Sequence, residues 1–256
     1  MTESSWWTKG ELLVDARQQG YELTDRTFTN WVQKGLLANA TTRGRGPASG
    51  VARVWPESQR QLLLKLLEER THTDRLALLA GIPIGIWLYF GDAYVDTRQV
   101  MKAMKTWARG FGKTSGPSAV GPARELAEQL AGPDLDPRLR DRFVELIRLF
   151  SPYPESFDRD VFKTSLQSLV DESTVDLEVN VEGLTMITEA RLRATRHIGR
   201  YTRDDYITAR AVVHATLAEY QSQVGEQAED FDLSERFRRS PIDLATQLGV
   251  IGLQSD

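Results

Sequence analysis

The residue types best suited to binding chemistry gather in one short segment, residues 25–34, with the sequence DRTFTNWVQK. Side chains three and four positions apart are neighbours on a helix, so Phe28, Trp31 and Val32 would share an apolar face. The polar residues left over are Arg26, Thr27, Thr29, Asn30, Gln33 and Lys34. Arginine pairs with guanine, asparagine or glutamine pairs with adenine, and threonine serves phosphate or the thymine methyl group. The segment therefore predicts a helix that reads duplex DNA.

A basic loop follows this helix and ends in a β-like run. Arg43, Arg45 and Arg53 are spaced through a Gly-containing stretch, and residues 51–55, VARVW, have the composition of a short strand. The window from residue 26 to residue 60 holds six basic residues and one acidic residue, in a chain whose total charge is −4. A compact positive window in an acidic protein indicates an anionic partner. We expect the three arginines to hold the DNA backbone or a narrow minor groove.

Capping residues place the elements around these side chains. Thr8 can cap a helix over residues 9–19, with Glu11 as its capping-box partner. Thr24 can cap a second helix that ends at Gly35. Helix, short turn, helix, basic loop and β-like run follow one another in the order of a winged helix-turn-helix, whose second helix enters the major groove.

Beyond residue 55 the pattern is helical almost throughout. Pro56 suits the first turn of a leucine-rich helix, and residues 96–110 form an amphipathic helix with basic residues opposite its apolar face. Thr202 with Asp205, and Ser240–Pro241, are typical of helix starts. Residues 174–183 alternate apolar and polar residues and could form a strand, but we interpret them as helix. The helices expected after this point are 56–70, 74–81, 96–110, 122–131, 137–150, 158–172, 183–199, 202–224 and 240–248.

In its first quarter the chain resembles the DNA-binding domain of MerR-type transcriptional regulators. That domain has an Arg-Thr pair in the recognition helix and an aromatic residue shortly before a Gly-Leu-Leu. Its wing ends in an arginine followed two residues later by an aromatic residue, and a leucine-rich helix comes next. The matching residues here are Arg26–Thr27, Trp31, Gly35–Leu36–Leu37, Arg53 and Trp55. The resemblance covers about residues 9–70 and implies a winged helix-turn-helix that binds DNA.

The chain departs from the family pattern at four places. Thr29 stands where the family usually has a second arginine, and Asn30 precedes Trp31 where an aromatic pair is usual. The wing is also longer than usual. After residue 80 the chain does not continue as the family's long antiparallel dimerisation helix. The resemblance therefore predicts a DNA-binding module and leaves the DNA target and the rest of the chain open.

Composition excludes several classes of function. The chain has no cysteine and three histidines, so Cys-based metal centres are excluded, and we expect neither metal nor cofactor. Residues 110–116, GFGKTSG, do not form a phosphate-binding loop, because Trp107 stands where that loop needs glycine. No catalytic constellation is present, so we expect no enzyme. Without a bilayer-spanning apolar run or a secretory signal, we expect a cytoplasmic protein with no membrane contact.

Two features leave further binding sites open. His197 and His214 fall in neighbouring expected helices and could meet, which makes a signal-sensing pocket a hypothesis beside a purely structural role. Residues 86–94, IWLYFGDAY, are apolar enough to be core. Since soluble monomers rarely expose such a patch, the alternative is a dimer interface or a groove for a partner or ligand.

The sequence thus predicts a mainly α-helical protein of two domains. Residues 1–110 form a MerR-like winged helix-turn-helix with a small β-wing and two extra helices, residues 111–122 a Gly/Ser/Pro-rich linker, and residues 123–256 an α-helical domain for dimerisation or sensing. That domain could take an unidentified small-molecule or protein effector. The residues expected at DNA are Arg26, Thr27, Thr29, Asn30, Lys34, Arg43, Arg45 and Arg53.

The expected function is sequence-specific binding of double-stranded DNA by a homodimer that regulates transcription, on half-sites about one helical turn or a multiple apart. Two alternatives remain. One is an architectural or mobile-element DNA-binding protein, such as an excisionase-like or plasmid-maintenance factor. The other is a helical protein-interaction module that has lost DNA binding.

Overall fold

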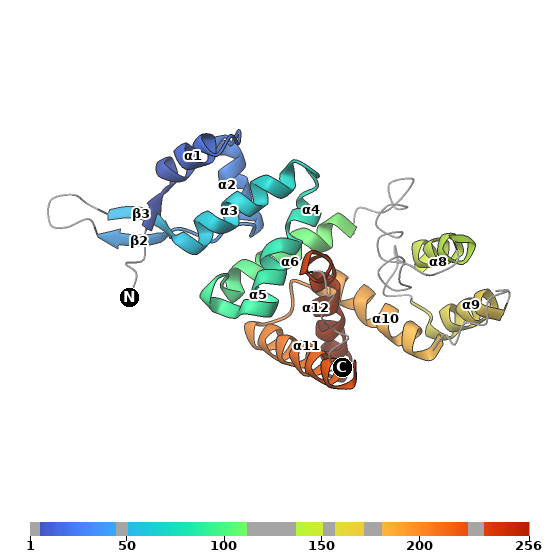
Figure 1. Cartoon of the computed structure of the whole chain (residues 1–256). Coiled ribbons are helices and arrows are strands. Elements are labelled where there is room, and N and C mark those ends of the chain that lie inside the picture. The colour runs from blue at the N-terminus through green and yellow to red at the C-terminus, as the bar shows by residue number, and fades with distance from the viewer. Residues whose placement is uncertain are drawn as a thin grey trace. The chain divides into compact units, whose positions relative to one another are not determined.

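The computed structural model describes residues 6–44, 51–111, 137–150, 157–171, 181–224 and 233–255 (Figure 1). The chain divides into two compact units. The first comprises Met1–Trp107 with Glu226–Pro241, and the second comprises Ala108–Gly225 with Ile242–Asp256. The protein is mainly helical, with one small antiparallel sheet in the first unit.

The first unit begins with the two helices that the capping residues predict. In α1 (Lys9–Gln18) the Thr8 side chain accepts from the Glu11 backbone N–H, and the Glu11 side chain accepts from the Thr8 backbone, which completes a capping box. In α2 (Asp25–Lys34) the Thr24 side chain accepts from the backbone N–H of Thr27. Gly35 ends α2 in the left-handed conformation, with φ +79°. Both starts and the Gly35 stop are confirmed.

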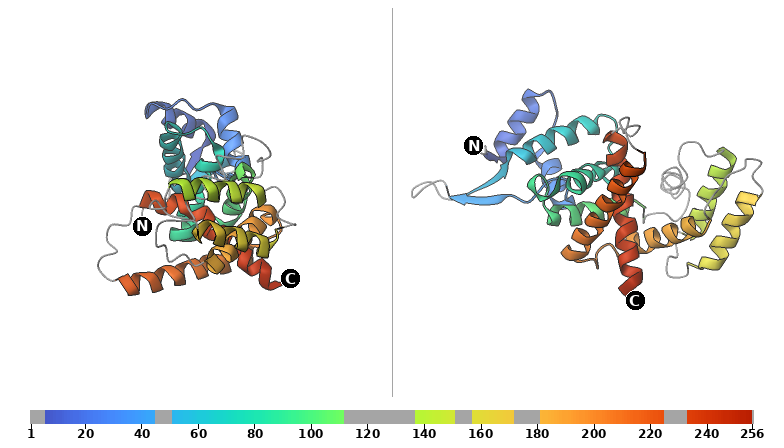
Figure 2. Two further views of the ribbon diagram at one scale, coloured as in Figure 1. Left: turned by 90° about the vertical axis from the view of Figure 1, so that its right-hand side faces the viewer. Right: turned by 60° about the horizontal axis from the view of Figure 1, so that its bottom comes forward.

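The first unit also contains a three-stranded antiparallel sheet, in the order β1-β3-β2, whose first strand precedes α1. The strands are β1 (Trp6–Thr8), β2 (Thr41–Gly44) and β3 (Val51–Pro56). The β3 strand is the β-like run that the sequence predicts, whereas β1 was not expected. Trp7 of β1 lies opposite Trp55 of β3, and β2 and β3 form the ribbon that projects from the helices of this unit (Figure 2).

The remaining elements of the first unit are helical and supply most of its core. They are α3 (Glu57–Arg70), α4 (Leu76–Leu79), α5 (Gly81–Phe90), the 3-10 helix η1 (Gly91–Ala93) and α6 (Thr97–Phe111). The α3, α4 and α6 helices are as expected, and Pro56 is the residue that precedes α3. The α5 helix was not expected. Fully buried side chains of this unit include Leu12, Phe28, Trp31, Leu63, Leu66, Ile84, Trp87, Val100 and Met104.

The aromatic segment 86–94 is only partly core. Trp87 and Leu88 are buried, and Trp87 Nε1 donates to Asp92 Oδ1 at 2.8 Å. Phe90 and Tyr94 are about half exposed and meet edge to face, with ring centroids 6.0 Å apart. The expectation of core packing therefore holds for the first pair and is wrong for the second, since Phe90 is the last residue of α5 and Tyr94 follows η1.

One segment of the described chain, Leu76–Ala93, is long and apolar enough by composition to cross a membrane. Half of it is buried, and it is divided among α4, α5 and η1. A core helix of a soluble protein passes the same test of composition. The segment is therefore weak evidence for a membrane span.

The described part of the second unit is helical. Its helices are α8 (Pro137–Phe150), α9 (Arg159–Asp171), α10 (Val181–His197), α11 (Arg203–Val224) and the greater part of α12 (Leu233–Ser255). The α8 and α9 helices lie side by side (Figure 2). Gly249 of α12 lies against the backbone of Ala190 in α10, where a larger side chain would not fit. Thr202 and Asp205 form the expected N-terminal signature of α11.

One of the helix starts expected from the sequence is wrong. Ser240–Pro241 was expected to begin a helix, but α12 begins at Leu233 and Pro241 lies inside it. A proline removes one hydrogen bond of a helix and does not always end it. The expected linker 111–122 begins with Phe111, which is the last residue of α6, and its other residues lie outside the described part of the chain. The expected helix 122–131 and residues 174–180 of segment 174–183 also lie outside it, whereas residues 181–183 begin α10.

Candidate nucleic-acid interface

An outward row of polar side chains follows the length of α2. Arg26, Thr29, Asn30 and Gln33 fall within about 100° of one another around the helix axis. Asn30 is half-buried and the other three are exposed. On the opposite face Phe28 and Trp31 are each 1% exposed, and Phe28 packs edge to face on Trp55 with centroids 5.2 Å apart. The helix is thus fixed by its aromatic face and presents the row to solvent.

Two threonines of the expected site are engaged within the protein. The Thr27 hydroxyl lies 2.9 Å from the Thr24 hydroxyl, as part of the N-terminal cap, and Thr27 is half-buried. The Thr29 hydroxyl donates to the Asp25 carbonyl at 2.9 Å and accepts from Lys9 Nζ at 2.9 Å. A hydroxyl group with these two partners has little hydrogen-bonding capacity left for a base edge. The Thr29 methyl group remains the part suited to a thymine methyl.

Lys9 is a cation at this surface that the sequence analysis did not assign. Its Nζ lies 2.5 Å from Asp25 Oδ1 and 5.7 Å from the centroid of the Phe28 ring. Lys9 is the first residue of α1, sixteen positions before Asp25, so no pattern within α2 could identify it. Its charge offsets that of Asp25, the first residue of α2.

The other end of α2 is held by α3 and α6. Gln99 Nε2 donates to the Leu36 carbonyl and Thr106 Oγ donates to the Lys34 carbonyl, at 3.0 and 2.7 Å. Gln59 Oε1 accepts from the Ala38 N–H at 2.8 Å, and Gln59 Nε2 donates to Gln99 Oε1 at 3.0 Å. The backbone of Lys34 is therefore fixed while its side chain is only half-buried.

The expected wing arginines lie on different faces of the ribbon. Arg43 lies opposite Ala52, and Arg53 lies opposite Thr42. Successive strand residues point to opposite faces, so Arg43 and Arg53 point to opposite sides of the β2–β3 pair. Arg53 shares the face of Trp55, which packs on α2, and both arginines are exposed. Arg45 lies outside the described residues.

A tryptophan that the sequence analysis did not assign supports Arg43. The guanidinium carbon of Arg43 lies 3.9 Å from the centroid of the Trp6 ring, a cation–π distance. Trp6 belongs to β1, which pairs with β3. The stack therefore depends on a strand pairing across some fifty residues of sequence, for which the sequence carries no local signal.

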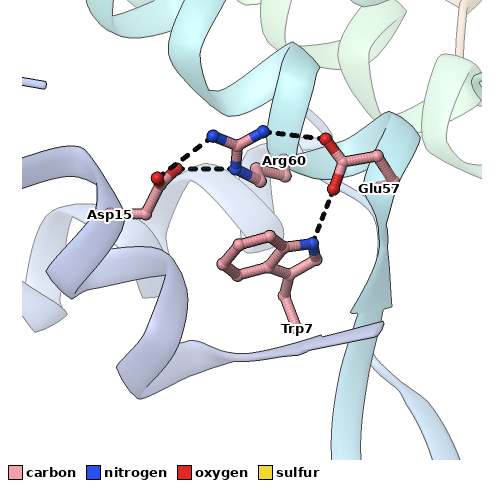
Figure 3. A network of polar contacts seen from close by, with 4 residues as sticks. All are labelled: Trp7, Asp15, Glu57 and Arg60. Carbon is pink, nitrogen blue, oxygen red and sulfur yellow. Dashed lines mark hydrogen bonds and ion pairs between the residues drawn. The ribbon is translucent and has the colours of Figure 1, made fainter. Parts of the chain in front are cut away.

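A polar network joins β1, α1 and α3 (Figure 3). Arg60 of α3 makes a two-point contact with Asp15 of α1, with Nε to Oδ2 at 2.7 Å and Nη2 to Oδ1 at 3.1 Å. Arg60 Nη1 also donates to Glu57 Oε1 at 2.8 Å, and Trp7 Nε1 of β1 donates to Glu57 Oε2 at 2.6 Å. The hydrogen bonds to Asp15 and Glu57 raise the pKa of Arg60 above its ordinary value.

The two histidines proposed for a sensing pocket lie in the second unit. His197 is the last residue of α10, and His214 is at an exposed position of α11. Among the residues that the structure describes, no group of three or more His, Asp or Glu side chains could hold a metal ion. The pocket stays a prediction.

Comparison with known proteins gives this chain no relative. No protein-family model, no curated protein and no solved structure matches it. The MerR resemblance of residues 9–70 therefore remains an expectation, and the site is judged on its own residues.

The Gln99 contacts give a first testable prediction. Gln99 is 3% exposed, and replacing it with leucine leaves the Leu36 carbonyl and one Gln59 N–H without their partners. A lost partner of a buried polar group costs about 1–3 kcal/mol. We expect Gln99→Leu to lower the free energy of unfolding in urea by that amount, whereas Gln61→Leu at an exposed site of α3 should change it by less than about 0.5 kcal/mol. Equal stability of the two variants would contradict the role assigned to Gln99.

Proposed function

We propose that the chain binds double-stranded DNA sequence-specifically, with α2 in the major groove and the β2–β3 wing on the backbone, and that it regulates transcription in the cytoplasm as a homodimer. The observation that carries the proposal is the outward row Arg26, Asn30 and Gln33 on a helix whose other face is buried. Arginine and the two amides are the side chains that make bidentate contacts with guanine and adenine.

The positions around this row support the same proposal. Lys9 and Lys34 flank the row, and Arg43 and Arg53 project from the ribbon. Phosphate contacts fix the orientation of a protein on DNA, and base contacts specify the sequence. The lysines and arginines would make the phosphate contacts, and the α2 row would make the base contacts. A single unit of this size offers few base contacts, so a two-fold dimer on a roughly palindromic site is the expected assembly.

The proposal is tested by comparing two variants on two duplexes. One duplex is selected by the protein from a random pool and the other is a mixed-sequence duplex. We expect Asn30→Ala to weaken binding to the selected duplex alone, by about 1–3 kcal/mol for a lost bidentate contact. Arg43→Ala should weaken binding to both duplexes alike and reduce the slope of log K against log salt by about one. Fluorescence anisotropy over a salt series measures both.

Three outcomes decide among the alternatives. Absence of wild-type binding to either duplex at low salt would reject DNA binding and leave the protein-interaction module. Equal effects of the two variants on both duplexes would show that α2 is not the recognition helix. Specific binding without any effect on transcription in vitro, confined to a plasmid or phage end in a footprint, would favour the architectural or mobile-element protein over the regulator.

A further inference from the structure

Helix α6 carries a row of cations that the winged helix does not include. Arg98, Lys102 and Lys105 are spaced four and three residues apart, so they lie within about 60° of one another around the α6 axis. Arg98 is exposed, and the two lysines are half-buried. At 1.5 Å per residue the row is about 10 Å long. That length matches about three phosphates of one strand, at 3.4 Å of helix axis each.

No carboxylate pairs with these cations among the residues that the structure describes. Lys102 Nζ donates to the neutral amide oxygen of Asn39 at 3.1 Å, and neither Arg98 nor Lys105 forms an ion pair there. The nearest acidic residue in sequence, Asp96, accepts from the Gln99 backbone N–H instead. Lys65 on α3 is the contrast, because its Nζ lies 3.1 Å from carboxylates of both Glu68 and Glu69.

The α6 row begins where the proposed recognition helix ends. A Cβ atom on Gly35 would lie 2.5 Å from the Lys102 Cβ and 2.5 Å from the Ala103 backbone nitrogen, so α6 touches the last turn of α2 directly. Thr106 holds the Lys34 carbonyl at this same contact. Lys34 and Lys102 therefore belong to two helices, α2 and α6, that pack on each other at this junction.

We propose that Arg98, Lys102 and Lys105 bind backbone phosphates of the DNA next to the groove that α2 enters, so that α6 extends the footprint beyond the winged helix. The inference rests on the proposed function. A partly exposed row of cations that has no carboxylate partner in the described structure, on a helix packed against the recognition helix, is suited to phosphates because the contact needs charge and position without base geometry. Specificity stays with α2, and α6 adds affinity that depends on salt.

The test compares Lys105→Gln with Lys65→Gln, and then uses the double variant Arg98→Gln/Lys105→Gln. Both single variants remove one lysine charge from a helix of the same unit, but only Lys105 lacks a carboxylate partner in the described structure. Each variant is titrated over a salt series on the selected duplex and on that duplex extended by mixed sequence at both ends. On the extended duplex we expect the log K–log salt slope to fall by about one for Lys105→Gln and about two for the double variant. Lys65→Gln should leave it unchanged, and the preference for the selected sequence should stay as in the wild type.

The outcomes separate this inference from the proposed function. If the wild type binds specifically and Asn30→Ala relaxes its preference, but the double variant keeps the wild-type slope, the α6 contact is wrong and the function stands. If Lys65→Gln and Lys105→Gln reduce the log K–log salt slope equally, the effect is one of net charge, and this result would also overturn the α6 contact. If the wild type binds neither duplex, the proposed function itself fails. Thermal unfolding checks that the variants are folded; should the double variant unfold, Lys105→Gln alone decides.

Discussion

Replacing Gly35 with alanine should lower the free energy of unfolding by about 2–5 kcal/mol. Two physical terms add. An L-residue in the left-handed region costs roughly 1–2 kcal/mol, and Gly35 has φ +79°. The new Cβ would also lie 2.7 Å or less from backbone atoms of Gln99 and Ala103, and overpacking a filled site costs about 1–3 kcal/mol. Urea unfolding followed by far-ultraviolet circular dichroism measures the sum.

Two other glycines separate these terms. Gly20 has φ +86° and open space around its Cβ position, so Gly20→Ala should show the conformational cost alone, about 1–2 kcal/mol. Gly10 is an exposed residue of α1 with nothing near its Cβ position, so Gly10→Ala should stabilise by about 0.5–1 kcal/mol. If Gly35→Ala costs no more than Gly20→Ala, α6 does not press on the end of α2. DNA binding by Gly35→Ala should fall too, because the end of α2 packs on α6 at this glycine, next to Lys102.

The helix boundaries around the site were predictable because capping is local. Thr8 with Glu11, Thr24 and Gly35 each act within three residues of their partners, so the sequence itself contains the whole interaction. The apolar spacing of Phe28 and Trp31 is local in the same way. These signals were enough to place α1, α2 and the polar row of α2.

Two elements that the sequence did not predict are β1 and α5. The β1 strand depends on a partner distant in sequence, and α5 contains residues that usually interrupt helices. The β1 strand has three residues and exists through pairing with β3, across some fifty positions. The α5 helix contains Gly81, Pro83 and Gly85, which usually interrupt helices, but a proline in a first turn loses no helical hydrogen bond. Burial against the rest of the unit then outweighs the weak propensity of the two glycines.

The same distinction applies to the candidate site. Arg26 and Gln33 are exposed because they lie on the side of α2 opposite Phe28, and the spacing of these residues in the sequence predicts that placement. The contacts of Lys9 with Thr29, of Trp6 with Arg43 and of Gln99 with the end of α2 join segments 20 to 63 residues apart. No local pattern encodes such contacts. The sequence could therefore indicate the helix for which we propose DNA binding, but it could not indicate the residues that contact that helix from distant segments.

Replacing Arg60 with leucine should lower the free energy of unfolding by about 3 kcal/mol. Asp15, whose side chain is 11% exposed, then keeps its charge without the guanidinium that holds both of its oxygens. Removing one partner of a buried pair costs about 3–5 kcal/mol, and some access to water places this pair at the lower end. Arg60 also lies 4.9 Å from the Trp7 ring centroid, so the substitution removes packing under β1. Urea unfolding of the wild type and the variant gives the difference.

A double-mutant cycle distinguishes the unpaired charge from the lost packing. Asp15→Leu alone should cost less than Arg60→Leu, because Arg60 keeps its bond to Glu57 at 2.8 Å. The variant with both substitutions no longer contains the Asp15 charge, and Glu57 loses Arg60 in this variant and in Arg60→Leu alike, so the double variant should be more stable than Arg60→Leu alone. If the double variant loses as much free energy of unfolding as the two single variants together, this account is wrong and the effect belongs to packing. Lys65→Leu, at an exposed ion pair of the same helix, should change stability by about 0.5 kcal/mol or less. The comparison thus tests whether the link from β1 through α3 to α1, behind the α2 row, is held by charge.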